Sequence, residues 1–230
     1  MAQYHRANQF NRTVGTAMVC IVSISGAFGH RKESEHSRAS MVWAPPPSLI
    51  PESLDLEPSV RKALLTQLRV ADLGIVLEQT PIQKAQERFG GKLGHSGDAG
   101  DSLTWLCLRG SDKRGPWALW LESGEMDGGT ISGLQWQRTE AAEKFSHGCP
   151  VLTTRDSTVE LPVMIRLGTK EANVLQALGQ PTTRHGDIFV YYHSHEVSIK
   201  GESYTVVSTL AIQIRGGVVQ AIQADQNTSS

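Results

Sequence analysis

Two stretches of the chain match each other without a gap at an offset of 89 residues. Residues 80–90 read TPIQKAQERFG, and residues 169–179 read TKEANVLQALG. Each stretch begins with a threonine, which can cap a helix, and ends with a glycine, which can terminate one. We therefore expect a helix in both places. Such a duplication constrains the fold strongly, because both copies must adopt the same structural unit.

Strand-like segments follow both copies in the same order. Residues 128–137 (GGTISGLQWQ) and 216–225 (GGVVQAIQAD) each start with a glycine pair, which supplies the positive φ of a tight turn. Two further segments with strand character precede each glycine pair, at residues 101–109, 116–123, 187–195 and 204–214. We predict an α+β fold of two tandem repeats, each a helix plus a three-stranded antiparallel meander, with the helices packed on one sheet face.

The predicted repeats occupy most of the chain after residue 57. An additional helix is expected at residues 59–70, where apolar residues recur on one side after Pro58. The predicted organisation is a signal peptide (1–27), a polar and Pro-rich linker (28–57), a first repeat (58–140), a connection (141–160), a second repeat (161–225) and a tail (226–230).

The N-terminus has the features of a secretory signal peptide. Residues 1–27 contain Arg6 and Arg12 but no acid, and residues 14–28 are uncharged and mostly apolar. Small residues near Ala27 predict cleavage after it; the alternative is a poorly packed N-terminus. Because this apolar stretch is shorter than the roughly 20 residues of a bilayer span, we expect no membrane span in the mature chain and a periplasmic or secreted location.

The cysteines agree with export. Cys20 leaves with the signal peptide, so that Cys107 and Cys149 remain. An even pair in an exported chain predicts a disulfide between them, which would close the first repeat onto the connection. Two separate buried thiols are the alternative.

Charge and motifs exclude several classes of function. The formal net charge is −1 and there is no basic block, so nucleic acid is not an expected partner. The sequence has no Gly-x-Ser-x-Gly, His-Glu-x-x-His or Cys-x-x-Cys motif, and we assign no catalytic residue, cofactor or metal. An alternative function as a small metal-binding protein or hydrolase would depend on His185, His193 and His195, which otherwise belong to a solvated strand end.

Aromatic residues gather in the predicted strands. Trp117 and Trp120 are three positions apart and Tyr191 and Tyr192 are adjacent, so the members of each pair must face opposite sides of a sheet. One of each pair therefore points away from the helices. We predict that the aromatic residues form a protein-binding surface on the open sheet face; the alternative is that other segments cover them. The set consists of Trp105, Trp117, Trp120, Trp136, Tyr191 and Tyr192.

The second copy resembles a known superfamily. Residues 167–169 (LGT), Val174 and residues 178–181 (LGQP) resemble the BamE-like superfamily, which includes a small lipoprotein of the outer-membrane barrel-assembly machine and a tandem-repeat β-lactamase inhibitor protein. The first copy departs from this pattern, with Ala85 in place of the valine and no proline after the helix. The resemblance implies an exported, non-enzymatic protein that binds an unidentified protein in the envelope or outside the cell, as an inhibitor or an assembly factor.

Overall fold

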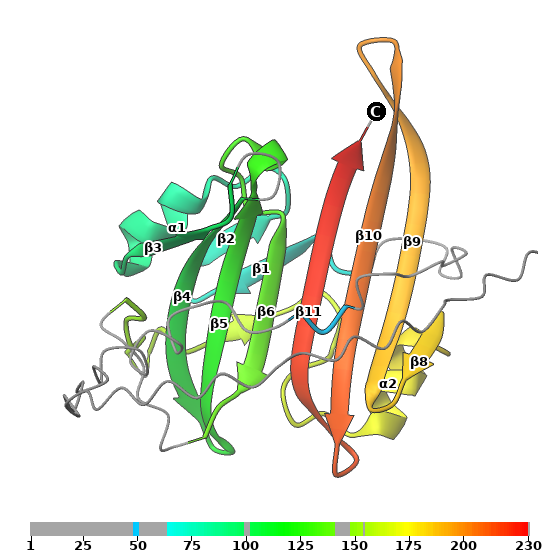
Figure 1. Ribbon diagram of the computed structural model, residues 1–230. Helices are drawn as coiled ribbons and strands as arrows, with labels where there is room; N and C mark the ends of the chain where they lie inside the picture. The colour runs from blue at the N-terminus through cyan, green and yellow to red at the C-terminus, as the bar shows by residue number, and fades with distance from the viewer. Residues whose placement is uncertain (1–47, 51–63, 99–101, 141–147, 154, 230) are drawn as a thin grey trace, which may run out of the picture. The chain divides into compact units, whose positions relative to one another are not determined.

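A computed structural model describes residues 48–50, 64–98, 102–140, 148–153 and 155–229. These described residues are mostly β, with 54% strand and 12% helix. The predicted α+β class is therefore wrong: the described residues form an eight-stranded antiparallel sheet, a three-stranded sheet and two α-helices, not two helix-plus-three-strand units (Figure 1). The predicted signal peptide and nearly all of the predicted linker lie outside the described residues.

The large sheet runs in the order β3-β4-β5-β6-β11-β10-β9-β8, so its first four strands and its last four meet where β6 pairs with β11. That junction joins residues 133–137 to residues 221–225. The strands are β3 (Leu93–Ser96), β4 (Leu103–Asp112), β5 (Gly115–Gly124), β6 (Gly133–Arg138), β8 (Thr183–His185), β9 (Ile188–Ile199), β10 (Glu202–Arg215) and β11 (Val218–Ser229).

The small sheet has the order β2-β1-β7 and corrects another prediction. Its strands are β1 (Gln67–Val70), β2 (Leu73–Val76) and β7 (Val159–Glu160). The helix predicted at residues 59–70 is wrong at least over its last four residues, which form β1; residues 59–63 are not described. Buried and exposed residues alternate along β1, so its side chains follow the two-residue period of a strand rather than the 3.6-residue period of a helix.

Two short helices do form in the matching stretches, α1 (Ile82–Phe89) and α2 (Glu171–Leu178). The equivalent residues Ala85 and Val174 are fully buried, and Gly90 and Gly179 end the helices with φ of 73° and 81°. Positive φ is easily adopted only by glycine, which explains the helix ends.

The threonines before these helices do not cap them. Thr80 Oγ1 accepts a hydrogen bond from the Val76 backbone N–H at 2.9 Å. Thr169 Oγ1 likewise accepts one from the Arg166 N–H at 3.0 Å. Both hydroxyls therefore stabilise the turn that leads into the helix, rather than the first helical N–H groups.

One face of the large sheet, which we call the covered face, carries the main core. The helices and the small sheet pack on it, and Trp117 and Trp136 meet there edge to face with ring centroids 6.0 Å apart. Large, fully buried side chains of this core include Ile75, Leu77, Ile82, Leu106, Leu119, Leu134, Tyr191 and Ile212.

The two glycine pairs play different parts. Gly216 and Gly217 have φ of 59° and 72° and form the tight turn between β10 and β11, as predicted. Gly128 and Gly129 lie instead in a longer connection between β5 and β6, which contains a 3-10 helix, η2 (Glu125–Asp127). The Asp127 carboxylate holds this connection together by accepting hydrogen bonds from the Gly124 N–H and the Ser132 hydroxyl.

Candidate functional site

The predicted disulfide between Cys107 and Cys149 is confirmed, with the two Cα atoms 4.8 Å apart. Backbone hydrogen bonds continue the attachment: the Arg109 N–H donates to the Pro150 carbonyl at 2.9 Å, and the Leu152 N–H donates to the Arg109 carbonyl at 2.7 Å. β3 pairs with β4 only as far as Leu106, so the segment after Cys149 occupies the edge of β4 that β3 leaves unpaired. The disulfide thus helps to close an exposed strand edge.

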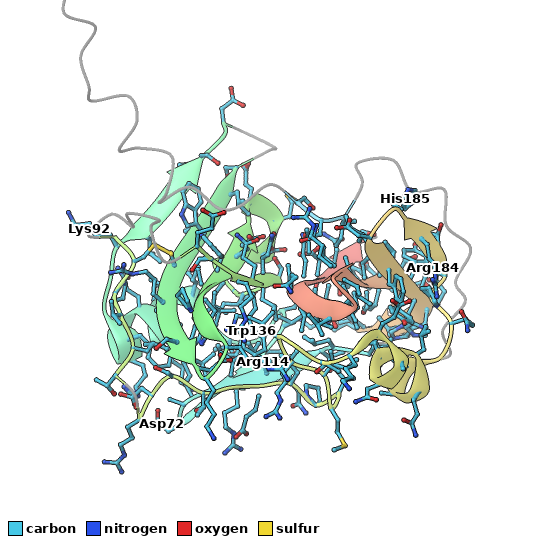
Figure 2. All side chains as sticks on the ribbon, turned by 90° about the horizontal axis from the view of Figure 1, so that it is seen from below. Asp72, Lys92, Arg114, Trp136, Arg184 and His185 are labelled. Carbon is cyan, nitrogen blue, oxygen red and sulfur yellow. A yellow bond between two sulfur atoms is a disulfide. The ribbon has the colours of Figure 1, made fainter. Side chains whose placement is uncertain are left out.

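The aromatic residues predicted as an exposed binding row are mostly buried. Trp117, Trp136 and Tyr191 belong to the core of the covered face, and Figure 2 shows Trp136 in the interior. Trp105 and Trp120 lie on the opposite face, packed around the disulfide with Ala118, and are only 4% and 3% exposed. Tyr192, at the next position of β9, is half-buried. Five of the six described side chains are therefore buried and do not form the predicted exposed row; Tyr192 alone among them exposes part of its surface.

The three histidines do not come together. His193 and His195 are neighbours on β9, with ring centroids 5.0 Å apart. His185 lies on β8 at the outer edge of the sheet (Figure 2), opposite Ile188. Ile188 precedes His193 by five positions, about 17 Å along a strand. Within the described ranges, no group of three or more His, Cys, Asp or Glu side chains is arranged to hold a metal.

The face opposite the covered face carries a pair of carboxyl groups in the middle of the sheet, which sequence analysis missed. Glu122 on β5 and Asp225 on β11 both lie opposite Gly133 of β6. A Cβ atom at Gly133 would lie 2.5 Å from Asp225 Oδ1, so glycine leaves the space that the carboxyl needs. Burial raises the pKa of Glu122 to about 8, with a contribution from the Asp225 charge, and burial raises the pKa of Asp225 to about 7.

Polar contacts continue from this pair along the same face. Gln223 Nε2 donates to Asp225 Oδ2 at 3.1 Å. Gln223 Oε1 in turn accepts hydrogen bonds from the Leu49 N–H at 2.6 Å and the Ser48 hydroxyl at 3.2 Å. Residues 48–50 are therefore fixed to the centre of this face by Gln223.

A groove lies on the covered face at the end of the sheet where β11 terminates. Its volume is 790 Å³. Two of its side chains are large, apolar and exposed: Met126 is 88% exposed and Ile199 is 46% exposed. The hairpin between β9 and β10 extends past the end of β11 and forms one wall (Figure 1). The remaining lining residues are Leu77, Glu78, Gln79, Asp127, Thr130, Tyr204, Gln226, Asn227, Thr228 and Ser229.

Glu78 projects into this groove from an unusual backbone conformation. Its φ is 60°, in the left-handed region that non-glycine residues rarely adopt. Its N–H donates to the Ile131 carbonyl at 2.7 Å. In the other half of the sheet the equivalent hydrogen bond runs from the Gly168 N–H to the Val219 carbonyl, also at 2.7 Å, and Gly168 has a φ of 81°. Glu78 thus occupies a backbone position at which the other half of the sheet has Gly168. Non-glycine residues with positive φ cluster at functional sites.

The carboxylates of the groove interact with neutral groups. Glu78 Oε2 accepts hydrogen bonds from Gln226 Nε2 and Thr228 Oγ1, both at 2.8 Å. Asp127 accepts its hydrogen bonds from a backbone N–H and a hydroxyl. Within the described part of the chain, neither acid has an Arg or Lys ion-pair partner, and no basic residue lines the groove.

Comparison with known proteins gave no relative: no family model, curated protein or solved structure matches the chain. The resemblance to the BamE-like superfamily therefore stays a hypothesis drawn from the sequence. Over the residues that the structure describes, no helix has both the length and the apolar character needed to cross a membrane.

Proposed function

We propose that this chain is an exported protein that binds another protein and does not catalyse a reaction, acting as an inhibitor or an envelope assembly factor. The disulfide between Cys107 and Cys149 supports export, since disulfides persist mainly in oxidising compartments. The resemblance of residues 167–181 to BamE-like proteins supports the same class, because members of that superfamily bind proteins.

The groove is the observation that carries this proposal. It combines exposed apolar side chains with acids that have no described Arg or Lys partner, as protein-binding surfaces commonly combine apolar anchors with polar groups. Met126 in particular is held out from the short helix η2 with most of its side chain in solvent. An exposed, flexible thioether is suited to binding surfaces, where it adapts its shape to a partner.

Photo-crosslinking in the native host tests the proposal. The full chain would carry the photo-reactive residue p-benzoylphenylalanine in place of Met126, or in place of Met164 as a matched control. Met164 is also a methionine and is 94% exposed, but it lies outside the groove. We expect a defined protein adduct from position 126 and none from position 164. An absence of adducts from position 126, or equal adducts from both positions, would refute binding at the groove.

A further inference from the structure

The end of β11 has a free edge in the groove. β10 pairs with β11 as far as Ser229, but β6 pairs with it only as far as Asp225. Residues 226–229 therefore have a strand neighbour on one side only, among the residues that the structure describes. All four of these residues line the groove.

Backbone hydrogen-bonding groups point from this edge into the groove. The Gln226 N–H donates to the Ser132 carbonyl at 2.9 Å, on the side away from β10. Because alternate residues of a strand direct their N–H and C=O groups to the same side, the N–H and C=O of Thr228 also point away from β10. Together with the Gln226 carbonyl, they present one donor and two acceptors to an incoming strand.

The charge of the groove defines what that strand should carry. Among the described residues that line the groove, Glu78 and Asp127 carry a charge at neutral pH, both as acids, and none is basic. The hydrogen-bond donors to both carboxylates are neutral. Among the residues that the structure describes, no Lys or Arg therefore neutralises the negative charge of Glu78 and Asp127 near the free edge. A Lys or Arg side chain would supply the missing opposite charge and form a charge-assisted hydrogen bond.

We propose that an extended segment of a partner protein, with a Lys or Arg at its centre, adds to the free edge of β11 as an additional strand. This inference rests on the proposed function and names the mode of binding. Strand addition obtains affinity from main-chain hydrogen bonds and specificity from pockets for alternate side chains. Here Met126 and Ile199 would contact the apolar side chains of the segment, and Glu78 would contact its basic one.

The probe is a phage-displayed library of ten-residue peptides with a fixed central lysine. Peptides are selected for binding to the oxidised full chain. Binding of selected peptides is then measured to Thr228→Pro and Thr228→Ala. Proline removes the N–H that points into the groove and is tolerated at an open strand edge, whereas alanine retains it. Both variants lose the hydroxyl that contacts Glu78, which makes alanine the matched control.

We expect Thr228→Pro to weaken binding at least tenfold relative to Thr228→Ala. We also expect Glu78→Gln to weaken binding about tenfold, and to have little effect on peptides whose lysine is replaced by alanine. A far-ultraviolet circular dichroism spectrum and a melting curve like those of the parent chain confirm that each variant is folded.

Two results would overturn strand addition. If Met126→Ser abolishes binding but Thr228→Pro has no effect, the groove binds through side chains alone, and the proposed function stands without this mode. If the library yields no binder, strand addition is refuted, and the crosslink from position 126 decides the proposed function independently.

Discussion

Replacing Glu122 by glutamine should remove about half of the pH dependence of stability above pH 5, because Asp225 contributes a shift of similar size. Glu122 and Asp225 are half-buried and lie on either side of Gly133, at the junction of β6 and β11. Ionising either carboxyl in this position is unfavourable, since it loses hydration and gains a like charge nearby.

The sign of the effect follows from the raised pKa values. The ordinary pKa of Glu122 is 4.5 and its pKa in the folded protein is about 8. Between these values the unfolded chain releases a proton that the folded protein retains, so the free energy of unfolding falls as the pH rises. At about 1.36 kcal/mol per pKa unit the loss is at most about 5 kcal/mol, and the partial exposure of the carboxyl makes it smaller.

Asp225 acts in the same direction, from an ordinary pKa of 3.8 to about 7. The two contributions do not simply add, because the charge of Asp225 contributes to the shift of Glu122. Asp187 has the opposite sign: Arg215 lowers its pKa, so its contribution is lost only as the pH falls below the ordinary carboxyl value. The two effects therefore occupy different pH ranges.

Urea unfolding of the oxidised protein at pH 5, 6.5 and 8 measures the effect. We expect the parent chain to lose stability steadily over this range, and Glu122→Gln to lose about half as much, because its amide does not ionise whereas Asp225 still does. Glu125→Gln is the control, since Glu125 is exposed in the adjacent connection. A parent chain whose stability is constant or rises from pH 5 to 8, or a Glu122→Gln slope equal to that of Glu125→Gln, would refute the reasoning.

Three further predictions concern single sites. Reduction of the disulfide, or Cys149→Ser, should lower the free energy of unfolding by up to about 4 kcal/mol; an unchanged melting temperature in reductant would contradict this. Gly133→Ala should cost about 1–3 kcal/mol in urea unfolding, because its methyl group meets the Asp225 carboxyl; a neutral effect would show that Asp225 moves freely. At position 78, the Glu78→Gly variant should be about 1–2 kcal/mol more stable than Glu78→Ala, because only alanine retains the cost of positive φ; equal stabilities would argue against the left-handed conformation.

Local features of this chain could be predicted from the sequence. Helices form in both matching stretches, and each ends at a glycine because glycine adopts positive φ easily. The turn at Gly216 depends on the same property of glycine. The opposite facing of Trp117 and Trp120 follows from the two-residue period of a strand.

Long-range features could not be predicted in this way. Residues 67–70 fit a helical pattern and a strand pattern, and their pairing with β2 and β7 decides between them. The burial of Trp120 depends on what packs over its face of the sheet, including the disulfide segment, which no local pattern reveals. The Glu122 and Asp225 pair is also invisible locally, because the two residues become neighbours only through the pairing of β6 with β11.

The second half of the sheet has a site that corresponds to the groove, and the two sites differ in volume and in charge. There Gly168 stands where Glu78 stands, and the guanidinium of Arg114 packs against it and donates to its carbonyl. The volume of that site is 310 Å³, and its charged side chains, Arg114 and Arg138, are basic; Arg138 already pairs with Asp112 at 2.7 Å. The same backbone arrangement is thus partly filled and basic at one end of the sheet. At the other end it is larger and acidic, and its acids have no ion pair with any residue that the structure describes. Glycine would adopt the backbone conformation of position 78 at less cost, so the glutamate there agrees with the binding role that we propose for the groove.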